Sequence, residues 1–354
     1  MGAQGGLHRL FIGTYTRGDS RGIYAVALAG ATGEWGAPEL AAESPNPTFL
    51  ALSPGREFLY AVRAGPGWAS SFRVDPGSGR LAPAHRPPPG EGPTPCHIAV
   101  DPRGRIGVAA NYHAGLAAAF PLGADGSVGP ARVVAHQGRG PHPTRQTSPH
   151  VHSANVSRDG RFALVCDLGL DRIYTYAIDR ASASLIPADP PCLAVAPGSG
   201  PRHLAADATG RRAYAINELS NTIVACAYDG ATGRLDPFQT VSVLPGGFAG
   251  AATAAEVAVH PGGRFLYGSC RGPDTLAVFS VDGATGALAP VEVVPCGGLG
   301  PRHFSISPDG AWLVCAHQDS GTLGAFRVDP SSGRLERVPG LAPVPMPVCA
   351  LFLY

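Results

Sequence analysis

The sequence predicts an all-β fold, a seven-bladed β-propeller with four-stranded antiparallel blades. Apolar runs begin about every 50 residues, a period typical of repeat folds, at Pro47, Pro95, Pro149, Pro201, Ala254, Pro301 and Pro347. The chain contains 48 glycines and 36 prolines, which gather in the turns between the runs, where they favour tight reversals. Short strands joined by regularly spaced turns are typical of all-β folds, and this period favours a propeller.

One repeat shows the order of elements within a blade. Its first three strands, a to c, cover 201–206, 211–217 and 222–228. The turns that follow these strands cover 207–210, 218–221 and 229–233. A short fourth strand, d, starts at Arg234. Connections this short join neighbouring antiparallel strands, so the repeat forms a meander. The same a–b turn recurs in other copies, for example at 157–160 and 307–310.

The first copy is incomplete, and the end of the chain supplies what it lacks. Residues 10–15 match a b strand, with no a strand before them, whereas 347–352 match an a strand with nothing after them. We therefore expect the C-terminal strand to complete the N-terminal blade. This closes the ring and removes the exposed edges of an open sheet. The prediction is one domain over 1–354.

Composition excludes several classes of function. The net charge is +1 and the charges are interspersed, which argues against nucleic-acid or membrane-surface binding. The 27 basic residues are all arginines, which excludes a lysine Schiff base. No pair among the 8 cysteines has CxxC spacing. We find neither a signal peptide in 1–15 nor a membrane span, and we expect a cytoplasmic monomer or weak dimer.

Strand direction places the polar residues on one face of the ring. Strands alternate in a meander, so the starts of the innermost strands and the b–c corners share one mouth of the central channel. At the starts of strand a lie His97, His150, His152, Arg202, His203, Glu256, Arg302 and His303. At the b–c corners lie Tyr112, Asp167, Asp171, Arg172, Glu218, Asn221, Arg271 and Asp274, among others. Arginines with a carboxylate and imidazoles can bind an anion and perform acid–base chemistry.

Each of these residues also has a structural interpretation. His150 and His152 have period-two spacing, which predicts both rings on one side of a strand. The pair could bind a metal, but zinc needs three or four ligands and no third stands out, so we expect no metal and no cofactor. Pro-Arg-His occurs at both 201–203 and 301–303, which favours a scaffold role for that motif. Glu218 differs from the other corners, which favours function.

Several motifs resemble a known family. They are Gly13-Thr14-Tyr15-Thr16, Arg145-Gln146, Pro149 to Ser153, Asp167 to Arg172, Gly200 to His203, Asn217 to Asn221, Gly250 to Glu256 and Arg271-Gly272. Together they resemble the seven-bladed lactonase family, which includes 6-phosphogluconolactonases and a fungal carboxy-muconate lactonizing enzyme. The resemblance implies a site at His150 or His152 with Arg202, Glu218 and Arg271. The chain departs from the family pattern at Cys270, Pro273 and His317.

The resemblance implies metal-independent hydrolysis of a sugar lactone, 6-phospho-glucono-1,5-lactone. Glu218 or one histidine of the 150/152 pair would activate water, Arg202 would stabilise the oxyanion, and Arg271 with Arg302 would hold the phosphate. The other expected substrate-binding residues are His203, Asp171, Arg172 and Asn221. Two alternatives stay open: a muconate-type cycloisomerase or a lactonase for another substrate, and a non-catalytic propeller that binds protein partners.

Overall fold

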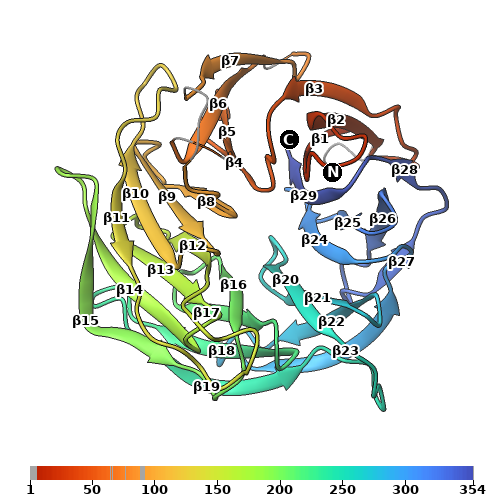
Figure 1. Ribbon diagram of the computed structural model, residues 1–354. Coiled ribbons are helices and arrows are strands. Elements are labelled where there is room, and N and C mark those ends of the chain that lie inside the picture. The colour runs from red at the N-terminus through yellow and green to blue at the C-terminus, as the bar shows by residue number, and fades with distance from the viewer. Residues whose placement is uncertain (1–5, 64, 66, 76, 88–91, 354) are drawn as a thin grey trace.

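Seven β-sheets surround a central axis in the computed structural model (Figure 1). The structure describes residues 6–63, 65, 67–75, 77–87 and 92–353. Residues 1–5 and residue 354 lie outside the described residues. The expected absence of a signal peptide in 1–15 and the two ends of the predicted domain therefore fall partly on residues that are not described. No helix occurs among the described residues, and hence none that could span a membrane.

Each blade is an antiparallel meander, as predicted. From the axis outwards, the innermost strands are β29 (Pro347–Phe352), β4 (Leu50–Leu52), β8 (His97–Val100), β12 (Val151–Val156), β16 (Pro201–Ala206), β20 (Thr253–Val259) and β24 (Pro301–Ile306). The second strands are β1 (Leu7–Thr14), β5 (Phe58–Val62), β9 (Ile106–Asn111), β13 (Phe162–Asp167), β17 (Arg212–Asn217), β21 (Phe265–Arg271) and β25 (Trp312–His317).

The outer half of each blade follows the same order. The third strands are β2 (Gly22–Ala29), β6 (Ala69–Val74), β10 (Leu116–Pro121), β14 (Arg172–Asp179), β18 (Thr222–Tyr228), β22 (Thr275–Val281) and β26 (Thr322–Val328). The outermost are β3 (Glu39–Glu43), β7 (Leu81–His85), β11 (Arg132–Ala135), β15 (Ser184–Ala194), β19 (Leu235–Ser242), β23 (Leu288–Pro295) and β27 (Leu335–Arg337). The last blade also has a short strand, β28 (Ala342–Pro343), which pairs with β26.

The C-terminal strand closes the ring. β29 pairs antiparallel with β1, with Ile12 opposite Ala350, and Figure 1 shows the blue C-terminal strand beside the red N-terminal ones. The first blade therefore has the order β29-β1-β2-β3, which confirms the predicted closure.

The apolar core lies between adjacent blades. Each of seven buried clusters among the described residues is built by two neighbouring blades. Trp312, fully buried, packs the last blade against Leu10 and Leu28 of the first. Because every blade buries its faces against two neighbours, the axis itself does not need an apolar filling. Polar side chains can therefore occupy the channel.

Bulges at the starts of the inner strands shape the channel mouth. In β12 the partners of β13 step from Val151 to Ser153, which leaves His152 as an extra residue. The same step leaves Arg202 extra in β16 and Arg302 extra in β24. A bulge turns a side chain away from the regular alternation of the strand and is frequent beside active sites.

Candidate active site

A cavity of about 630 Å³ opens at the channel mouth. Starts of inner strands and b–c corners line it together, which confirms the predicted sharing of one face. Its charged lining residues are Arg17, Arg145, Glu218, Arg271 and Arg302, and His113 and His152 lie beside them.

Glu218 binds three arginines. Its Oε1 accepts a hydrogen bond from Arg145 at 2.5 Å, and its Oε2 lies 3.1 Å from Arg202 Nε and 3.1 Å from Arg271 NH2. The Glu218 side chain is only 5% exposed. Burial would raise the pKa of Glu218, but Arg271, Arg202 and Arg145 outweigh burial and lower the pKa to about 2. Glu218 is therefore a firmly ionised carboxylate.

His152 lies beside this cluster. Its Nε2 is 3.9 Å from Glu218 Oε2, and the residue is 5% exposed. Burial, with the charges of Arg202 and other nearby groups, lowers the pKa of His152 well below its ordinary value. The imidazole is therefore neutral at pH 7 and can accept a proton.

Two further arginines that line the cavity lie near one aromatic ring. The Arg17 guanidinium lies 4.9 Å from the centre of the Tyr15 ring, and that of Arg302 lies 5.6 Å from it. In the part of the chain that the structure describes, neither forms an ion pair with a carboxylate. Their charge is therefore available to an anion in the cavity.

Three expected residues, His150, Arg202 and His203, lie outside the cavity lining. β12 begins at Val151 and His152 is its bulge residue, so strand alternation does not relate His150 to His152, although both rings contact Tyr112. His150 stacks on Tyr112 at 4.3 Å and donates from Nδ1 to the Tyr112 carbonyl. Arg202 is 2% exposed and His203 is 4% exposed, and neither lines the cavity.

Three predicted substrate-binding residues are placed at blade corners outside the cavity lining. The Asp171 carboxylate accepts from the backbone N–H groups of Gly198 and Gly200. Asn221 donates to the Ala252 carbonyl, and Arg172 is at the outer side of the corner, with NH1 4.0 Å from the Cys192 sulfur. Asp171, Asn221 and Asp274 all have positive φ, at 54°, 55° and 53°. These positions repeat from blade to blade, so they belong to the scaffold.

The departures from the family pattern also lie outside the cavity lining. Cys270 is buried and donates to the side-chain oxygen of Asn221. His317 is buried, with Nε2 bonded to the Cys296 carbonyl and Nδ1 beside Thr322.

Of the cavity-lining residues Arg145, Tyr112 and Arg17, the corner positions in the sequence placed only Tyr112 on this face. Arg145 lies on the long loop between β11 and β12, where only the Arg145-Gln146 motif pointed to it. Gln146, fully buried, anchors this loop by donating to the Leu168 carbonyl and to Asp171. Tyr112 Oη accepts from Arg145 at 3.3 Å. Arg17 follows Tyr15 at a corner, and no pattern in the chain marked it.

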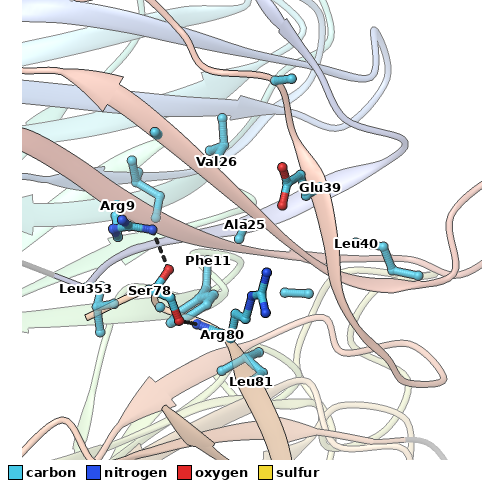
Figure 2. Close-up of a pocket in the computed structure, with 15 residues that line it drawn as sticks. Arg9, Phe11, Ala25, Val26, Glu39, Leu40, Ser78, Arg80, Leu81 and Leu353 are labelled. Atoms are coloured by element: carbon cyan, nitrogen blue, oxygen red, sulfur yellow. Dashed lines mark hydrogen bonds between the residues drawn. The ribbon is translucent and has the colours of Figure 1, made fainter. Parts of the chain in front are cut away.

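A second cavity lies between the first two blades, beside the c–d turn of the second (Figure 2). It measures about 490 Å³, and Arg9, Glu39 and Arg80 are its charged lining residues. Arg9 donates to the Ser78 carbonyl (Figure 2). None of the predicted site residues lines this cavity.

The described residues contain no candidate metal site, because no group of three or more His, Cys, Asp or Glu side chains among them is arranged to hold a metal ion. The channel mouth instead gathers cations around one carboxylate, which suits an anionic ligand.

Fold and cavity together define a seven-bladed propeller with a charged cavity at one channel mouth, where three arginines surround one buried carboxylate. The family described as "Lactonase, 7-bladed beta-propeller" matches residues 9–352. The chain therefore belongs to the seven-bladed β-propeller lactonase family, as its motifs predicted.

Similar proteins extend over the whole chain. A 6-phosphogluconolactonase of Bacillus subtilis is 36% identical over 347 residues, covering 97% of this chain and 98% of its own. The crystal structure of a putative 6-phosphogluconolactonase from Bacteroides fragilis has a TM-score of 0.89 at 34% identity, covering 98% of both chains. The periplasmic gluconolactonase of Pseudomonas aeruginosa has a TM-score of 0.90 at 36% identity, covering 99% of both.

Proposed function

We propose that this protein hydrolyses 6-phospho-glucono-1,5-lactone to 6-phosphogluconate. The observation that carries the proposal is the channel-mouth cavity, where neutral His152 lies beside Glu218 and its arginines, and which Arg17 and Arg302 also line. The names of the similar Bacillus and Bacteroides proteins support this substrate.

His152 is the base in this mechanism. Both carboxylate oxygens of Glu218 are bound by arginines, so Glu218 is not free to take a proton from water. Its carboxylate instead holds Arg145, Arg202 and Arg271 in place. His152 is neutral at pH 7, and its Nε2 lies on the side of Glu218.

The reaction then runs in two steps. His152 Nε2 takes a proton from water as the water oxygen attacks the lactone carbonyl carbon, and the carbonyl electrons move onto its oxygen. When this oxyanion collapses, the bond between the carbonyl carbon and the ring oxygen breaks. The proton on His152 passes to that ring oxygen, which becomes a hydroxyl. The carboxylic acid formed then releases its proton to solvent.

Arg271 is the oxyanion donor in this arrangement. Its side chain is 19% exposed and lines the cavity, whereas Arg202 is enclosed and binds Glu218 and the Ala255 carbonyl. Burial, with Arg302 and Arg271 nearby, lowers the pKa of Arg202 to about 9, which leaves it charged at pH 7. We therefore assign the expected oxyanion role to Arg271, supported by Arg202.

The substrate phosphate binds at Arg302 and Arg17 in this arrangement. Both lie near the Tyr15 ring and have no carboxylate partner among the described residues, so a phosphate there gains charge-assisted hydrogen bonds. The lactone carbonyl then faces Arg271 and His152.

A lactonase assay with two substrates tests the function and the orientation together. Acid release, corrected for spontaneous hydrolysis and measured after dialysis against a chelator, is expected with the phosphorylated lactone. Arg271→Gln should lower kcat by roughly 100-fold or more, as for other oxyanion donors. Arg302→Gln should raise KM for the phosphorylated lactone by about 10-fold or more, since a charge-assisted hydrogen bond is lost, and leave the free lactone unchanged.

The control is Arg234→Gln, at an exposed pair with Asp236 on a c–d turn, which should leave both parameters unchanged. Equal efficiency of wild type on free and phosphorylated glucono-lactone would contradict the phosphate assignment. Turnover of a muconate and of no sugar lactone would favour the cycloisomerase alternative. No turnover of any lactone or muconate would leave the non-catalytic, partner-binding alternative.

A further inference from the structure

A second polar cluster lies on the inner strands, and its members His203 and His303 each follow a bulge residue by one position. It contains His97 of β8, His203 of β16, Glu256 of β20 and His303 of β24. All four are at least nine-tenths buried, and none lines the cavity at the mouth. The mechanism above uses none of them.

Glu256 is the centre of this cluster. Its Oε2 lies 2.9 Å from His203 Nδ1 and 3.3 Å from His303 Nε2. The Ala350 N–H donates to His303 Nδ1, so the proton of neutral His303 is on Nε2 and is donated to Glu256. In the same way, neutral His203 donates from Nδ1 to Glu256. The Nε2 atom of His203 is therefore a free acceptor.

The cluster reaches the active site through His203 and His152. The centres of the two rings are 5.1 Å apart. His203 Nε2 and His152 Nδ1 are both buried, and neither has a hydrogen-bond partner. A buried ring nitrogen without a hydrogen-bond partner is unfavourable, and the neighbouring rings of His152 and His203 contain two such nitrogens. One water molecule is the smallest group that can bond to both.

We propose that a water joins His152 Nδ1 to His203 Nε2, so that His203 and Glu256 act as positioning residues for the base His152. The inference rests on the proposed function for its catalytic part. The water donates one hydrogen to His203 Nε2, and its oxygen accepts the Nδ1–H of His152.

This chain of hydrogen bonds stabilises His152 when it is charged. After His152 Nε2 takes the proton of the attacking water, the imidazolium donates from Nδ1 to the bridging water. That water donates to His203, which donates to the Glu256 carboxylate. No proton leaves Nδ1 of either ring, and the proton on His152 Nε2 later passes to the ring oxygen of the substrate. Glu256 thus supplies a negative charge that Glu218, bound by three arginines, does not.

The surroundings of both groups set the pH dependence. Burial raises the pKa of Glu256, which His303, Arg202 and Arg302 partly oppose. The groups that face Glu256 are His203, His303, Arg202, Arg302 and the Cys349 thiol. The groups that face His152 are Glu218, Arg202, His203, Arg271, Arg302, Tyr112 and Cys96.

The kinetic test compares wild type with Glu256→Gln, which keeps an acceptor for His203 but removes the charge. At pH 7.5 we expect kcat to fall by roughly 10- to 100-fold, as for other residues that support a ligand or base, with KM nearly unchanged. Because the pKa of Glu256 is raised, wild type loses the same charge as the pH falls. The ratio of the two kcat values should therefore shrink toward one at acid pH.

His203→Phe, which keeps an aromatic ring beside Phe49, should lower kcat by a similar factor, and the double variant should be no worse than either single one. A ratio that stays constant with pH, or additive losses, would show a purely structural role and overturn the proposal.

A high-resolution crystal structure tests the bridge without any substrate. It should show a water about 2.7–3.2 Å from both nitrogens. Density that shows no shared water, or both nitrogens bonded to other groups, would overturn the inference even for an active lactonase. A bridging water in a protein that hydrolyses no lactone would instead contradict the proposed function, and with it the catalytic part of this inference.

Discussion

At the scale of single residues, the channel mouth depends on the charge balance around Glu218. A buried carboxylate is costly unless it is paired, and here Arg145, Arg202 and Arg271 pair with it. The three arginines carry more positive charge than the one carboxylate cancels. The surplus attracts an anionic substrate, while the carboxylate fixes the positions of the guanidinium groups.

Replacing Glu218 by Gln should therefore damage both stability and turnover. Three arginines would be left without their buried counter-charge, which should cost about 3 kcal/mol of unfolding free energy. Displaced arginines should lower kcat by about 100-fold or more. Denaturant unfolding and the lactone assay measure the two effects.

The matched control is Asp236→Asn, which removes the carboxylate of an exposed pair with Arg234. It should change the unfolding free energy by less than about 1 kcal/mol. A Glu218→Gln protein as stable and active as this control would contradict the assigned role.

At the scale of elements, two devices place the site residues. Bulges in β12, β16 and β24 turn His152, Arg202 and Arg302 out of the strand alternation. The loop between β11 and β12 brings Arg145 to Glu218. Gln146 fixes this loop, because its buried side-chain amide donates hydrogen bonds to the Leu168 carbonyl and the Asp171 carboxylate.

Gln146→Ala should loosen the loop without changing any cavity side chain. Amide exchange over 136–150 should become faster, and KM should rise by roughly 10-fold as Arg145 loses its fixed position, in line with the sensitivity of catalysis to small displacements. Mass-spectrometric hydrogen exchange and steady-state kinetics check both. Thr147→Ala, at the exposed neighbour, is the control, and equal exchange rates in the two variants would refute the anchoring role.

At the scale of the whole molecule, packing between blades leaves the channel free to hold buried histidines. Burial lowers the pKa values of His97, His152 and His203 well below the ordinary value, and that of His303 to about 4. Each is neutral in the folded protein over a pH range in which the unfolded chain is protonated. The ring closure by β29 is what keeps these groups away from water.

The free energy of unfolding should therefore fall as the pH falls below about 6.5. Between that value and the lowered folded pKa, the unfolded chain binds more protons, so each histidine removes up to about 1.4 kcal/mol of stability per pH unit. Glu256, whose pKa is raised, opposes this trend, but it is one group against four. Denaturant unfolding at pH 7.5 and 5.5 measures the slope.

His97→Phe should flatten this slope, since one buried imidazole is removed beside Phe49. His113→Asn, at an exposed corner, serves as the comparison. A slope that is the same in wild type and His97→Phe would contradict the explanation.

The sequence by itself determined the propeller, its seven blades, the closing strand and the face on which the polar residues gather. These follow from the period of the apolar runs and from alternating strand direction, which can be followed along the chain alone. Asp171 and Asn221 share one corner position with Asp274, and this recurrence favours a scaffold role for them.

Only the tertiary structure decided which polar residues meet. His152 and Arg302 reach the cavity because bulges break the alternation that sequence spacing assumes. Arg145 reaches Glu218 across 73 positions of sequence, and Glu256 lies between His203 and His303 of neighbouring blades. Such contacts depend on how neighbouring blades pack around the axis, and no local pattern in the chain encodes which side chains meet there.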